Sequence, residues 1–140
     1  MRILSVMLCR LALPSARGGW SLDGYPTTEI SVADVPSWIE VAAVVKVEAV
    51  APELRAGPHV LRGTVRDGAH RRIEGVQGGE ATIPFRSNGA DGRAEAAVAA
   101  LNLRIPVTAP GPHRVELWAA DAAVQEPLLV EVSARDRWVP

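Results

Sequence analysis

The chain has 140 residues, of which 48% are hydrophobic and 22% charged, and its formal net charge is -1. This length fits a single domain, 1–140, that can bury about two-thirds of its unfolded surface. The composition excludes a disordered chain, and the missing basic excess argues against a nucleic-acid partner bound through its phosphates.

The first predicted strand covers residues 2–13 and ends at Pro14. Its apolar run, from Ile3 to Cys9, also resembles the core of a short signal peptide, because Arg2 precedes it. Arg10 interrupts that run at the short end of signal-peptide lengths, so we favour a buried strand in a cytoplasmic protein over secretion. No run approaches the ~18 apolar residues of a membrane-spanning helix, and no membrane partner is expected.

Three further extended segments follow the first strand. Residues 20–24 alternate in polarity and predict a short strand paired back on the first, and residues 29–32 predict a few extended residues. Residues 38–50 alternate most clearly of all. One face would carry only apolar residues, namely Ile39, Val41, Ala43, Val45, Val47 and Ala49. The many β-branched residues favour a strand over a helix here.

The middle of the chain predicts shorter strands separated by turns. Residues 59–66 predict a strand, Asp67-Gly68 a hairpin turn, and residues 71–76 an antiparallel return strand. Residues 81–85 predict another strand, followed by a flexible loop over residues 86–93.

The segment Ala94–Ala100 is compatible with helix or strand, because it is rich in alanine. We predict strand from Val98 onward and leave residues 94–97 open. Strands over 101–107, 113–118 and 128–132 follow, the first two joined by a corner at Pro110-Gly111-Pro112. Residues 134–140 would form a loose tail that Trp138 could pin.

Together these segments predict an all-β protein: an antiparallel β-sandwich of 7–9 strands, with an ordered core over residues 2–133 and no secure helix.

Several motifs support a resemblance to a known family. They are the opening strand ending in Leu8-Cys9, the alternating segment Trp20–Tyr25, the stretch Val35–Ile39, the strand Pro110–Leu117 and the final Pro127–Val130. In these the chain resembles a family of small bacterial domains of unknown function, often from actinobacteria. The resemblance implies an immunoglobulin-like sandwich and a bacterial, cytosolic origin, and it implies no activity. Arg10 stands where the family carries an acid.

No residue pattern points to chemistry. The three histidines, His59, His70 and His113, lack metal-motif spacing and are predicted to lie at the surface or in turns. Cys9, the single cysteine, excludes an internal disulfide and is predicted to be a core residue. We therefore predict no catalytic residue, no metal site and no cofactor.

One surface residue stands out. The alternation places Trp118 on an outward face with Arg114 and Glu116. Such a tryptophan is either covered by another segment or exposed as an interface anchor. We expect Arg104 on the same face, with Arg62 and Arg66 nearby. The leading hypothesis is a non-enzymatic protein-interaction or accessory module; the alternatives are a small-ligand or carbohydrate-binding module and a cryptic hydrolase.

Overall fold

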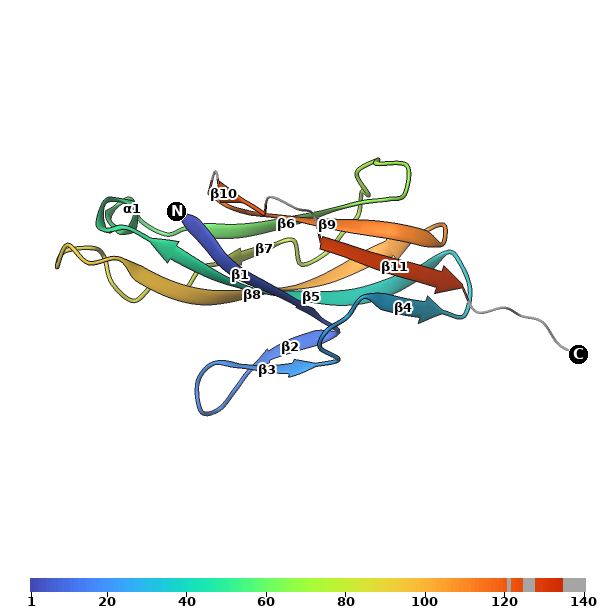
Figure 1. The fold of residues 1–140 in the computed structure, drawn as a ribbon, viewed down its shortest axis with the longest axis horizontal. Coiled ribbons are helices and arrows are strands. Elements are labelled where there is room, and N and C mark those ends of the chain that lie inside the picture. Colours follow the sequence, from blue (N-terminus) through green and yellow to red (C-terminus); the bar gives the residue numbers. More distant parts are fainter. Residues whose placement is uncertain (121, 125–127, 135–140) are drawn as a thin grey trace, which may run out of the picture.

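The computed structural model describes residues 1–120, 122–124 and 128–134 (Figure 1). These residues form eleven strands and one short helix. In chain order they are β1 (Arg2–Cys9), β2 (Leu11–Pro14), β3 (Trp20–Asp23), β4 (Glu29–Val32), β5 (Ser37–Ala49), α1 (Ala51–Arg55), β6 (Val60–Arg66), β7 (Glu80–Thr82), β8 (Glu95–Val107), β9 (Gly111–Ala119), β10 (Ala122–Ala123) and β11 (Leu128–Ala134). The chain is all-β, as predicted.

One layer is a three-stranded antiparallel sheet in the order β1-β5-β8. The strands β5 and β8 pair along their whole length, from Ser37 opposite Val107 to Ala49 opposite Glu95. The open question about Ala94–Ala100 is thereby answered: β8 begins at Glu95, because the alanine-rich segment continues the alternation and pairs with β5.

The other layer has the strand order β4-β11-β9-β6-β7, with β10 paired to β9. Its pairs are antiparallel except β4–β11, which run parallel. The prediction of a purely antiparallel fold is therefore wrong for this pair. Two strands far apart in sequence can pair in either direction, since no tight turn joins them.

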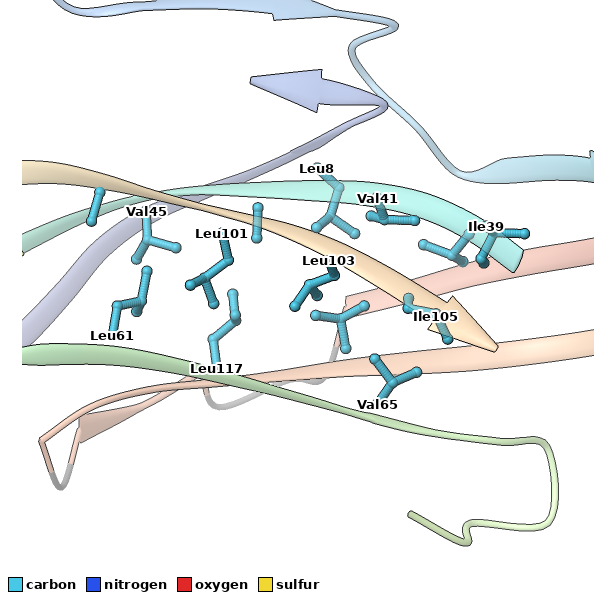
Figure 2. Close-up of a cluster of buried hydrophobic side chains, with 14 of the residues drawn as sticks. Leu8, Ile39, Val41, Val45, Leu61, Val65, Leu101, Leu103, Ile105 and Leu117 are labelled. Atoms are coloured by element: carbon cyan, nitrogen blue, oxygen red, sulfur yellow. The ribbon is translucent and has the colours of Figure 1, made fainter. Parts of the chain in front are cut away.

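The main core lies between the two layers. In Figure 2, side chains from β5 and β8 point toward those of β6 and β9. The largest fully buried side chains are Leu61, Leu101, Leu103, Ile105, Leu117, Val41, Val45, Val47, Val65, Val107, Val115 and Val130. All six apolar positions predicted for the inner face of β5 are buried.

The corner at Pro110-Gly111-Pro112 joins the two layers. The strands on either side, β8 and β9, belong to different sheets, so the corner carries the chain across the core. Gly111 adopts a φ of 127°, which side chains rarely allow, and nothing lies within 4 Å of a Cβ built there.

The predicted first strand is two strands. It breaks at Arg10, after which β2 leaves the sheet and pairs with β3 in a separate hairpin. Figure 1 shows this hairpin on the outer side of the β1-β5-β8 sheet. The predicted pairing of residues 20–24 with the opening segment is thus confirmed for the part of that segment that follows Arg10.

Four other predictions need correction. Residues 71–76 form no strand; a single bridge joins Arg72 to Arg66, because the turn at Asp67 leads directly into a loop. The described residues hold more strands than the 7–9 predicted, since short edge strands escape the alternation pattern. Helix α1 also forms although no secure helix was predicted, and at its start the Glu53 carboxylate accepts the Val50 amide proton at 3.0 Å. Ala134 belongs to β11, and the rest of the predicted tail, with Trp138, lies outside the described residues.

Candidate functional site

Trp118, Arg114 and Glu116 share the outer face of β9, as their alternation predicts. Each is half-buried. Their partners across the strand pair are Arg62, opposite Trp118, and Arg66, opposite Arg114. Arg62 thus lies beside the tryptophan as expected, whereas Arg66 lies four residues away along the strand pair, beside Arg114.

Two of the four charges in this cluster, Arg66 and Glu116, pair with each other. Arg66 donates from Nε to Glu116 at 2.5 Å and from a terminal nitrogen to the His70 carbonyl at 3.0 Å. The short strand β10 lies alongside, with Ala123 opposite Trp118. A half-buried tryptophan with a paired carboxylate beside it offers a partner less apolar area and fewer free charges than the sequence suggested.

Arg104 does not belong to this face, contrary to our prediction. It lies on β8, in the other sheet, with its guanidinium carbon 4.6 Å from the centre of the Trp38 ring. Trp38, on β5, is 45% exposed. The alternation of residues 38–50 is a signal that could have indicated Trp38, because it falls on the same face as Glu40. The position of Arg104 beside Trp38 depends on the pairing of β5 with β8, which the local sequence does not reveal.

Arg104 also borders a small depression in the surface. The depression has a volume of about 100 Å³ and is lined in part by Arg10, Leu11 and Glu40. Leu11 is itself an exposed large hydrophobic residue. We call Trp38, Arg104, Glu40, Arg10 and Leu11 the Trp38 surface.

The histidines occupy three different environments. His70 is exposed in a turn at a φ of 61°, as predicted. His59 is half-buried; its Nε2 lies 2.6 Å from the Glu53 carbonyl and its ring packs edge-on against Phe85. His113 is 3% exposed, so the prediction of a surface or turn position is wrong for it. The alternation of β9 places it inward with Val115 and Leu117.

His113 borders a cavity of about 530 Å³ at one end of the fold, together with Asp67 and Ile73. Its Nδ1 lies 2.9 Å from the Gly111 carbonyl oxygen. Hydrogen bonds from the Arg71 and Ala69 amides lower the pKa of Asp67, and the nearby charge of Arg71 lowers it further. Within the described chain, no histidine side chain hydrogen-bonds a carboxylate, hydroxyl or thiol. The cavity therefore lacks a preformed nucleophile–base pair.

Cys9 is fully buried, which confirms the core prediction. Burial raises the pKa of its thiol, and its Sγ lies 3.5 Å from the Leu11 carbonyl. A protonated, enclosed thiol is a poor nucleophile.

A further hollow lies beside the β2–β3 hairpin. It is a groove of about 730 Å³ whose lining includes Met7, Trp20, Leu22, Val44 and Val98. No motif in the sequence pointed to it, because its walls come from segments that meet only after the hairpin folds back on the sheet.

In the described ranges, no three side chains of His, Cys, Asp or Glu gather as a metal site would need. The same residues include no helix long and apolar enough to cross a membrane. Comparison with models of known protein families and with curated protein sequences gives no match to this chain.

Proposed function

We propose that this chain is a non-enzymatic interaction module that binds a partner protein through the Trp38 surface. The exposed stack of Trp38 and Arg104 carries the proposal. Tryptophan and arginine are the side chains most enriched among residues that dominate binding energy at protein interfaces. Here they lie on a regular sheet, so they are presented with little loss of conformational freedom on binding.

The charges around the stack favour a particular partner chemistry. The Arg104 guanidinium has no hydrogen bond or ion pair with any described residue, so it can pair with a carboxylate of the partner. Leu11 adds apolar area at the same place. An acidic side chain next to an apolar one on the partner would complement both features.

The test is affinity capture of partners from the source cell, followed by binding measurements with the purified partner. Trp38→Ala should weaken binding by about 30-fold or more, the effect of losing a dominant interface residue. Trp118→Ala, on the other sheet, is the matched control and should leave the affinity unchanged. Retained binding by Trp38→Ala, or loss with Trp118→Ala alone, would contradict the proposal.

Small-molecule binding is a second candidate function, favoured by the groove beside the hairpin. Its volume falls in the range of about 300–1,000 Å³ typical of ligand pockets. Trp20 is the one aromatic residue in its lining. A sugar-binding site usually presents several aromatic side chains, so an apolar ligand suits the groove better than a carbohydrate.

An immunoglobulin-like sandwich and membership of the family of small bacterial domains also remain proposals. Two facing sheets with an apolar interior support the first, and the strand-end motifs quoted above support the second. An experimental structure whose sheets do not pack across one core would contradict the sandwich.

A further inference from the structure

The outer face of the β1-β5-β8 sheet is unusual because part of it is apolar. A sheet with one face on the core normally shows polar residues on the other. Here Ala42 and Val44 of β5 point outward and are nevertheless buried. They form a second apolar cluster with Cys9 and Ala12. The β2–β3 hairpin covers them, so another segment of the same chain shields this part of the face from water.

The hairpin covers this face incompletely, and the groove of about 730 Å³ lies beside it. Its floor includes Met7, Val44 and Val98 from the three strands of the sheet, and Trp20 and Leu22 of the hairpin form one side. The side chains of the floor and the hairpin are apolar. An occupant would therefore need an apolar body to gain from leaving water.

The lining of the groove also includes two charged residues, Arg86 and Glu95. The carboxylate of Glu95 is engaged at both oxygens, by the backbone amides of Arg86 at 2.6 Å and Ser87 at 2.7 Å. The Arg86 guanidinium, in contrast, has no hydrogen bond or ion pair with any residue that the structure describes. The charged group available to a ligand in the groove is thus the Arg86 guanidinium, a cation with a planar, forked set of donors.

We propose that the groove binds a small amphipathic anion, with its apolar body against Trp20, Val44 and Val98 and its carboxylate on Arg86. The proposal rests on the second candidate function and is independent of the Trp38 surface. A medium-chain fatty acid has this chemistry. The unpaired charge of Arg86 favours a carboxylate ligand over a neutral apolar molecule. The hairpin beside the groove favours a small ligand over a partner protein that would dock a flat surface there.

The test is calorimetric titration of the whole chain with decanoate, octanoate and decanol, all below their micelle-forming concentrations. Decanoate should bind at one site, about 15-fold more tightly than octanoate, since each buried methylene contributes about fourfold. Arg86→Gln should weaken decanoate binding by up to about fivefold, as expected for an exposed ion pair, and leave decanol binding unchanged.

A second variant blocks the groove without touching the core. Ala96 lines the groove and is exposed, so Ala96→Phe fills the space while the fold is retained, as circular dichroism and thermal unfolding would verify. It should reduce decanoate affinity at least tenfold, whereas Trp38→Ala should not change it. The proposal fails if decanoate shows no saturable binding, or if decanol binds as tightly as decanoate. It also fails if Ala96→Phe leaves the decanoate affinity intact and instead alters self-association or protein capture.

Discussion

At the scale of single residues, Gly78 determines how the loop after β6 reaches the other sheet. It has a φ of +77°, and a Cβ built on it would lie 2.1 Å from the Asn102 carbonyl oxygen. Beside it, Gln77 and Arg104 exchange two backbone hydrogen bonds at 2.9 Å. The absence of a side chain at Gly78 is what allows this loop to dock on the edge of β8.

We predict that Gly78→Ala destabilises the protein more than Gly92→Ala. The two glycines share nearly the same φ, +77° and +75°, but nothing lies within 4 Å of a Cβ at Gly92. Gly92→Ala should cost only the left-handed backbone strain, about 1–2 kcal/mol. Gly78→Ala adds a clash with backbone that cannot rotate away. Urea unfolding of both variants measures the difference, and equal losses would contradict the role assigned to Gly78.

At the scale of elements, the β2–β3 hairpin depends on one side chain from the sheet beneath it. The Asn102 amide bonds both backbone groups of Ala12: Oδ1 accepts the amide proton at 3.1 Å, and Nδ2 donates to the carbonyl at 3.0 Å. The side chain thus acts like a short piece of neighbouring strand. Ala12 is fully buried, so removing the asparagine side chain leaves both backbone groups without this partner.

We expect Asn102→Ala to loosen the hairpin without unfolding the two main sheets. Leaving two buried backbone groups unpaired costs about 1–3 kcal/mol each. Hydrogen exchange at the β2 and β3 amides should therefore accelerate by about tenfold or more, while exchange in β5 and β9 changes little. Asn88→Ala, in an exposed loop, is the control. Uniform acceleration across all strands would show that the hairpin is not a separate unit.

At the scale of the whole molecule, stability comes from the interlocked side chains between the layers. Leu101 is fully buried, and a Cβ added to Gly63 would lie only 2.9 Å from its Cδ1, so the two sheets approach closely at this point. The strands on either side come from different layers, β8 and β6. Their contact is one of those that hold the layers together.

We predict that Leu101→Ala costs about 2–5 kcal/mol of the free energy of unfolding, through lost burial and the cavity it leaves. Leu129→Ala is the matched control, since Leu129 is 50% exposed on β11 and should change stability by less than about 0.5 kcal/mol. Denaturant midpoints at constant slope give both values. A small effect at Leu101 would mean that the sheets can close over the gap.

The sequence by itself determined most of the strands and which of their residues face inward, because in a strand alternate side chains point to opposite faces. The buried row of β5 and the outward Trp118 follow from this rule alone. It does not specify strand partners, so only the tertiary structure brought Arg104 onto Trp38, ran β4 parallel to β11 and placed a cavity beside the inward-facing His113. The tertiary structure also decided the surroundings of Val44. Its alternation places it on the outer face, yet a hairpin covers it and it borders a groove. Such contacts join residues distant along the chain, and local periodicity carries no information about them.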